Sequence, residues 1–138
     1  MNKDAQMKKI LLILMMLHVM LFAEFKSIGV EEFKKLQKEG IAVFDIRTPM
    51  EWQDIGVIEG SIKATFFSEQ GQPLLADFFY TLGTLVKDKS QPFIIYCAHA
   101  SRTQSLGQGL MAMGFENVYE LKDGIENGWI KAGEKVVK

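Results

Sequence analysis

The sequence predicts an α/β fold, with a mainly parallel sheet flanked by helices on both faces. Two short apolar runs, residues 41–44 and 93–96, are continuous rather than alternating, which is typical of strands buried on both faces. Segments with helix signals alternate with these runs along the chain, in the order expected for a parallel sheet. Both observations therefore favour one α/β domain.

Length, charge and composition limit the function classes. The chain has 138 residues, enough for one domain with a sizeable core, and 48% of them are apolar. A formal net charge of -1 argues against a surface devoted to nucleic acid or to anionic membranes. One cysteine and two histidines, at positions 18 and 99, cannot form a zinc cluster, and one cysteine cannot form an intramolecular disulfide. We therefore expect no metal, no cofactor and no nucleic-acid partner.

The first 23 residues differ from the rest of the chain. A positive segment, with lysines at 3, 8 and 9, precedes residues 10–22, which are apolar except for one histidine, and Ala23 offers a cleavage point. This is the pattern of a secretory signal peptide, and the run is shorter than the about 20 residues of a membrane span. We predict that residues 1–23 are a cleaved signal peptide and that residues 24–138 fold after export to the periplasm or another external compartment. An uncleaved N-terminal anchor and a buried core helix are the alternatives.

The first half of the domain contains several local signals. Ser27 is the expected N-cap of a helix that carries acidic residues in its first turn and stops at Gly40. The strand at 41–44 comes next. Thr48 then caps a short helix that begins at Pro49 and reaches residue 53. A loop with a short strand (56–60), a further short strand (61–65), a polar connection (66–73) and a helix (74–85) complete this half.

The second half repeats the alternation of strand and helix. The strand at 93–96 precedes a helix expected at 103–113, which Gly114 ends. A third strand is expected at 117–121. After a turn at 123–124, a last short helix is expected at 125–132.

Cys97, the only cysteine, directly follows the strand at 93–96. Six residues, from Cys97 to Arg102, form a loop that leads into helix-forming sequence. Backbone N–H groups, the helix dipole and a guanidinium all favour a charged sulfur, so the thiol is placed to become a thiolate. The chain is therefore a candidate cysteine enzyme. A buried, inert cysteine is the alternative.

Four segments, in order, give the chain a resemblance to the rhodanese-like domain family, the sulfurtransferases, over residues 26–137. They are an Asp-x-Arg with a following Glu and aromatic (44–52), a Val-Ile-Glu-Gly-Ser segment (57–61), the thiol loop (97–102), and a Gly-Phe-x-Asn-Val segment with a later Trp (114–129). The chain departs from the family pattern at Val57, Glu59 and Asp123. It also departs at Ala100, which stands where Cys-x-x-Gly-x-Arg has its glycine. If that position requires a positive φ, alanine costs about 1 kcal/mol there.

The resemblance implies a sulfurtransferase in which Cys97 takes a sulfane sulfur from thiosulfate or polysulfide and holds it as a persulfide. The persulfide sulfur then passes to a thiophilic acceptor such as cyanide, a thiol or a protein. The catalytic pair is Cys97 with Arg102, whose charge pins the loop or an anionic donor. The substrate-binding set is the run of N–H groups around the loop, together with two residues at the end of the first buried strand: Ala98, His99, Ala100, Ser101, Thr103, Asp45 and Arg47.

Several roles stay open at this point. His99 is either a rim residue or a group that activates Cys97 or binds the donor, since imidazole exchanges protons near neutral pH. Ser101 is expected to hydrogen-bond within the loop or cap the helix. Asp45 and Arg47 either form an ion pair with each other or with Glu51, or orient Arg102 or the donor.

Other functions compete with sulfur transfer. Ala100 favours a non-enzymatic or slow persulfide carrier, or a protein-binding module, with the same fold. Redox sensing by Cys97 would need a second chain, because no resolving cysteine exists in this one. Phosphatases and arsenate reductases of the same fold hold one more residue between Cys and Arg than the four present here, which argues against those activities. The oligomeric state is not predicted.

Overall fold

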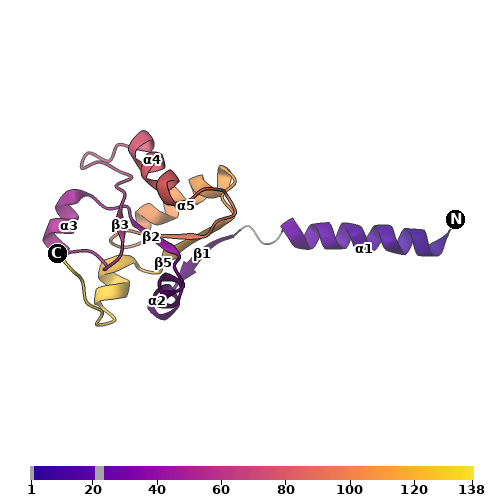
Figure 1. Cartoon of the computed structure of the whole chain (residues 1–138), viewed down its shortest axis with the longest axis horizontal. Helices are drawn as coiled ribbons and strands as arrows, with labels where there is room; N and C mark the ends of the chain where they lie inside the picture. Colours follow the sequence, from indigo (N-terminus) through magenta and orange to yellow (C-terminus); the bar gives the residue numbers. More distant parts are fainter. Residues whose placement is uncertain (1, 21–23) are drawn as a thin grey trace.

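The computed structural model describes residues 2–20 and 24–138 (Figure 1). Helix α1 (Lys3–Met20) lies apart from the folded domain, and its side chains up to Ile13 are exposed. Ile10 and Leu11, for example, are 56% and 65% exposed, so the alternative of a buried core helix is wrong for this part of α1. Within the described residues, no helix combines the length and apolarity needed to cross a membrane. The predicted cleavage point at Ala23 falls outside the described residues.

Five parallel strands form one sheet in the order β1-β5-β4-β2-β3. Their bounds are β1 Glu24–Ile28, β2 Ala42–Asp45, β3 Ile62–Lys63, β4 Phe93–Tyr96 and β5 Asn117–Leu121. The central strand β4 is buried at every residue, as its continuous apolar sequence predicts. The predicted α/β class with a mainly parallel sheet is confirmed.

Helices cover both faces of this sheet, which confirms the predicted layers (Figure 1). The elements are α2 Val30–Lys38, α3 Pro49–Ile55, α4 Leu75–Leu85, α5 Ser101–Ala112 and a π-helix, η1 Ile125–Ile130. One core contains Phe78 of α4 and Leu110 of α5. The other contains Phe33 of α2 and Trp129 of η1.

The sequence interpretation missed β1, and this is the main correction to the fold. Ser27, expected to cap a helix, lies in β1 opposite Glu120 of β5. The helix begins instead at Val30, after Gly29. The edge strand β1 exposes three of its five residues, so its sequence lacks the apolar run that identified the interior strands.

Most other local predictions are close to the observed elements, but residues 56–60, expected to include a short strand, contain only an isolated bridge from Val57 to Val137. Thr48 caps α3 in a capping box: its Oγ1 accepts from Glu51 N at 3.4 Å, and Glu51 Oε2 accepts from Thr48 N at 3.0 Å. The strand order then places the ends of β2 and β4 side by side, since Asp45 pairs with Tyr96 and Ile46 N donates to Tyr96 O at 3.0 Å. Cys97 therefore emerges at the carboxyl edge of the sheet.

Candidate active site

Cys97 is fully buried directly after β4, and its Sγ lies 3.8 Å from Oγ1 of Thr103. The carbonyl oxygens of Cys97 and Ala98 accept hydrogen bonds from the N–H groups of Ile125 (2.9 Å) and Glu126 (3.1 Å). The start of η1 thus fixes one side of the loop. The contact is so close that a Cβ on Gly124, where φ is 72°, would lie 2.3 Å from Ala98 O.

The backbone N–H groups of residues 98–103 differ from these carbonyl groups in having no protein partner among the described residues. Gln104 N is the first to bond, to Ala100 O at 3.0 Å. Unpaired N–H groups at the start of a helix form an anion-binding site. The residues of the predicted nest thus keep their N–H groups without a protein acceptor in the described part of the chain: Ala98, His99, Ala100, Ser101, Arg102 and Thr103.

Ala100 has a φ of 72°, in the left-handed region that favours glycine. We expect Ala100→Gly to raise the free energy of unfolding by up to about 1 kcal/mol, because an L-residue pays a steric cost in this conformation. Urea unfolding would measure the change. Ala98→Gly is the matched control: Ala98 is buried without a positive φ, so glycine there should lower stability. Equal losses in both variants would contradict the expectation.

Arg102 forms a two-pronged ion pair with Glu51. Its Nη1 donates to Oε2 at 2.8 Å, and its Nη2 donates to Oε1 at 2.6 Å. The pair fastens α5, and with it the end of the loop, to α3. The pKa of Arg102 is raised, mainly by the hydrogen bond to Glu51 and less by the nearby charges of Cys97 and Asp45. Arg102 thus pins the loop through a carboxylate, a partner that the sequence did not indicate.

The same contacts affect Glu51. Burial alone would raise its pKa, but hydrogen bonds from Arg102 and Thr48 outweigh that and lower the pKa to about 2. A free glutamate titrates at about 4.3. The folded protein therefore gains stability from ionised Glu51 above about pH 4.3, and this gain is lost as the pH falls towards 2.

A pH series with Glu51→Gln tests this expectation. The difference in melting temperature between the natural chain and Glu51→Gln should be largest above about pH 5 and should vanish near pH 2. Glu116→Gln, which changes an exposed glutamate, should show no such dependence. A difference that is constant from pH 7 to pH 2 would contradict the role of the ion pair.

Asp45 and Arg47 form a completely buried ion pair with each other. Arg47 Nη2 lies 2.7 Å from Asp45 Oδ2, and Arg47 Nε lies 3.0 Å from Asp45 Oδ1. Arg47 Nη2 also donates to Gly56 O at 2.6 Å. Although burial lowers the pKa of Arg47, the contacts with Asp45 reverse this and raise it. Of the roles left open, the structure shows the mutual ion pair, which braces the end of β2, rather than a pair with Glu51.

His99 and Ser101 lie on the outer side of the loop. The His99 side chain is 55% exposed, and its Nε2 lies 3.1 Å from Glu126 Oε2, so it turns towards η1 rather than towards Cys97. Ser101 is exposed at the first position of α5, and the helix has no side-chain cap. His99 is therefore placed as a rim residue, and Ser101 does not cap the helix.

The sequence interpretation missed one polar residue close to Cys97, namely Glu120. Glu120, in β5, is only 1% exposed and accepts hydrogen bonds from the Thr103 hydroxyl and from Gln104 Nε2. Its signal in the sequence is faint. Within the predicted strand 117–121 it shares a face with Val118, where an apolar residue is expected.

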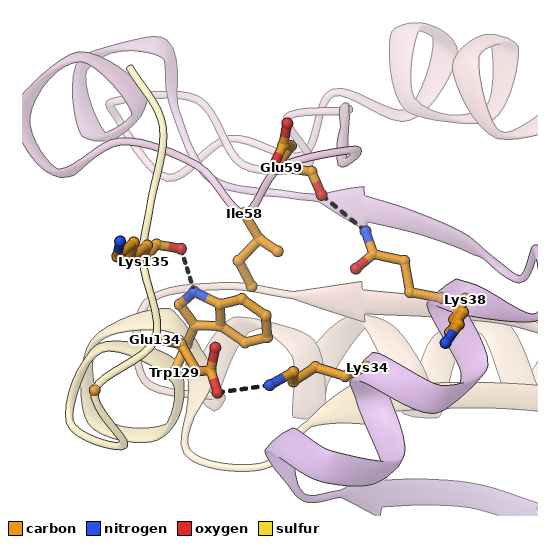
Figure 2. Close-up of a pocket in the computed structure, with 9 residues that line it drawn as sticks. Lys34, Lys38, Ile58, Glu59, Trp129, Glu134 and Lys135 are labelled. Atoms are coloured by element: carbon orange, nitrogen blue, oxygen red, sulfur yellow. Dashed lines mark hydrogen bonds and ion pairs between the residues drawn. The ribbon is translucent and has the colours of Figure 1, made fainter.

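Two cavities bear on where the site lies. One, of about 450 Å³, adjoins the loop: Arg102 and Glu51 line it together with residues 67–69 and 71. The other, of about 560 Å³, lies between α2 and the C-terminal segment (Figure 2). Figure 2 shows Lys34 paired with Glu134 at its edge and Trp129 as its floor. Because no residue of the Cys97 loop lines the second cavity, only the first adjoins the candidate active site.

Comparisons with known proteins identify both curated relatives and solved structures that are similar to this chain. The thiosulfate sulfurtransferase GlpE of Pseudomonas entomophila is 34% identical over 104 residues, which are 75% of this chain and 84% of that protein. GlpE of Ectopseudomonas mendocina is 33% identical over the same shares. A solved thiosulfate sulfurtransferase from Pseudomonas aeruginosa matches with a TM-score of 0.64 and 25% identity, over 82% of this chain and 20% of that one.

A solved rhodanese-related protein from Thermoplasma volcanium shares the fold, with a TM-score of 0.61 and 21% identity over 82% of this chain and 98% of that one. The family model described as the rhodanese-like domain matches residues 29–131, which include the whole Cys97 loop and all strands but β1. The chain therefore belongs to the rhodanese-like domain family.

Proposed function

We propose that the protein is a rhodanese-type sulfurtransferase that accepts a sulfane sulfur from thiosulfate or polysulfide on Cys97 and passes it to a thiophilic acceptor. The observation that carries the proposal is the single cysteine followed directly by six backbone N–H groups, those of residues 98–103, that donate to no protein acceptor in the described part of the chain. The names of the GlpE relatives, thiosulfate sulfurtransferases, support the choice of donor.

The chemistry needs a thiolate and a place for negative charge. The Cys97 thiolate attacks the outer sulfur of thiosulfate, a new S–S bond forms, and sulfite leaves with the electrons of the old one. The persulfide then carries its charge on the outer sulfur, where unpaired N–H groups stabilise it. An acceptor nucleophile attacks that sulfur, and the Cys97 thiolate leaves.

Burial of Cys97 affects both halves of this cycle, because thiosulfate reaches Sγ only when the loop opens, and the acceptor meets a constraint as well. The residue is 0% exposed, so a bulky acceptor cannot reach Sγ itself in this conformation. A persulfide places its outer sulfur about 2 Å beyond Sγ, the length of an S–S bond. The acceptor therefore meets the outer sulfur rather than Sγ.

Intact-mass spectrometry of the full chain, before and after incubation with thiosulfate or polysulfide, tests the proposal. A gain of one sulfur mass that dithiothreitol removes is the expected result. The gain should be absent from Cys97→Ser, because this chain has no other thiol. The absence of an adduct with either donor would count against the proposed activity.

A second candidate is a persulfide carrier with little turnover. Two observations favour it: Ala100 in a conformation that suits glycine, and the full burial of Cys97. A carrier would take up one sulfur per chain while steady-state turnover with cyanide stayed negligible. A kcat in the usual enzyme range, about 1–10³ s⁻¹, would eliminate this candidate.

Export is part of the proposal. We infer that residues 1–23 direct the chain out of the cytoplasm and are removed after Ala23. The lysines and the apolar run of the sequence support this inference. Strand β1 begins at Glu24, so cleavage at that point would leave every strand of the sheet intact.

Fractionation of a Gram-negative host that expresses the full chain should recover a periplasmic protein. Its mass should correspond to a chain that begins at Glu24. Leu12→Arg, which places a charge in the apolar run, should keep the chain uncut in the cytoplasm. A full-length chain in the membrane fraction would indicate an anchor instead. A natural chain that stays uncut in the cytoplasm would contradict export.

A further inference from the structure

Hydrogen bonds connect the thiol of Cys97, through the hydroxyl of Thr103, to the buried carboxylate of Glu120. Cys97 Sγ lies 3.8 Å from Thr103 Oγ1, and Thr103 Oγ1 is hydrogen-bonded to Glu120 Oε2. Cys97 and Thr103 are 0% exposed, and Glu120 is 1% exposed. The three groups come from the end of β4, the first turn of α5 and the interior of β5. None of them lies at the protein surface.

Proton counting shows what this chain of contacts permits. The Thr103 hydroxyl has one proton and two lone pairs, but three neighbours: Cys97 Sγ, Glu120 Oε2, and Ala100 O at 2.9 Å. With a thiol and an ionised carboxylate, the S–H donates to Thr103, and Thr103 donates to Glu120. With a thiolate and a protonated carboxyl, Glu120 donates to Thr103, whose proton turns to the sulfur or to Ala100 O. The same atoms satisfy both arrangements.

Other charged groups around Cys97 are already engaged. Arg102 and Glu51 pair with each other, as do Asp45 and Arg47. His99 points outward to Glu126. Among the residues that the structure describes, Glu120 is the one carboxylate that a single hydroxyl, that of Thr103, connects to the Cys97 thiol.

On the described strands and helix that pack against Glu120, which are β1, β4 and α5, no positively charged side chain is free to pair with it. On β1 its partner is Ser27, while the charged Glu24 and Lys26 pair with Asn117 and Tyr119, on the opposite face of the sheet. On β4 its partner is Ile95, and the titratable Tyr96 belongs to the other face. Arg102 is the only charged residue of α5, and it is held by Glu51. Glu120 therefore has two neutral donors, Thr103 and Gln104, as its recorded partners.

We propose that Glu120 is a positioning residue that receives the proton of Cys97 through Thr103 and returns it when the thiol re-forms. As the S–H bond of Cys97 breaks, its proton moves to Thr103 Oγ1, and the hydroxyl proton of Thr103 moves to Glu120 Oε2. Charge is conserved: a carboxylate is neutralised and a thiolate appears. The step needs no water at the buried sulfur. It rests on the proposed function, in which Cys97 is the nucleophile, and assigns the destination of its proton.

A thiolate titration of the full chain tests this without requiring turnover. The ultraviolet absorbance of the thiolate is recorded from pH 5 to pH 10, and the titration of Cys97→Ser is subtracted to remove the tyrosines. Glu120→Gln should form the thiolate at a higher pH than the natural chain, and its rate of alkylation by iodoacetamide at pH 7 should fall by about tenfold or more. Glu116→Gln, an exposed control near the start of the same strand, should match the natural chain.

The sign of the shift separates the proposal from a simple charge effect. If Glu120 were only a nearby negative charge, its removal would make the thiolate easier to form, and the titration would move to lower pH. An unchanged or lowered titration in Glu120→Gln would therefore overturn the proposal. Thr103→Val keeps Glu120 but breaks the connection, and should behave like Glu120→Gln, whereas Thr103→Ser should behave like the natural chain.

Three further outcomes remain informative. If Glu120→Gln does not fold, as judged by circular dichroism, the comparison of Thr103→Val with Thr103→Ser decides the question. If the chain takes up no sulfur from thiosulfate or polysulfide but Glu120→Gln raises the titration, the proposed function fails while the proton path stands. If sulfur transfer occurs but the titration does not rise, the proton path alone fails.

Discussion

Replacing Cys97 by serine is expected to abolish sulfur transfer. The chain has one thiol, and a serine hydroxyl at the same place is neither ionised at neutral pH nor able to hold a sulfane sulfur as a persulfide. Loss of a covalent nucleophile costs enzymes on the order of 10⁴-fold or more in rate. The formation of thiocyanate from thiosulfate and cyanide should therefore fall to the uncatalysed level.

The fold should survive this change, since sulfur and oxygen differ little in size. Circular dichroism and urea unfolding of Cys97→Ser would check this. Ser105→Ala, an exposed change on α5 outside the loop, is the matched control and should retain the activity of the natural chain. Thiocyanate formation that persists in Cys97→Ser would remove the basis of the proposed function, because no other thiol in the chain could carry the sulfur.

The sequence predicted the interior of the sheet well, for a physical reason. Strand β4 was placed with its observed bounds and β2 within one residue, because a strand buried on both faces needs a continuous apolar run. Strand β5 was also placed with its observed bounds, although its sequence includes Asn117 and Glu120. Strand β1 had no such run. Its identity depends on pairing with β5, which lies about 90 residues later in the chain, and nothing local specifies that pairing.

The same distinction between local and long-range information applies to the candidate site. The position of Cys97 and the run of N–H groups follow from a strand that ends where a helix begins, so local sequence was enough to predict them. The partners of Arg102 and Thr103 are Glu51 and Glu120, which lie on separate elements. Only the packing of α3, α5 and β5 brings these carboxylates to the loop. Local reasoning could place Glu51 on a helix, but could not say where its side chain points.

The largest loss of stability is expected from Asp45→Asn. The change keeps the shape of the side chain but leaves the Arg47 guanidinium, 0% exposed, without a countercharge. Removing one partner of a buried ion pair costs about 3–5 kcal/mol. Since domains of this size have only about 5–15 kcal/mol in total, the urea midpoint should fall sharply. Glu134→Gln, which removes the partner of the half-exposed Lys34, is the control and should leave the midpoint nearly unchanged.

The same variant separates the two roles left open for Asp45 and Arg47. If their pair braces the end of β2, Asp45→Asn at a temperature where it is still folded should keep the KM for thiosulfate of the natural chain, despite its lowered midpoint. A donor-binding role predicts the reverse, a raised KM with little loss of stability. The full burial of both side chains, together with the bond from Arg47 to Gly56 O, favours the first outcome. A raised KM with an unchanged midpoint would show that Asp45 acts on the donor rather than on the fold.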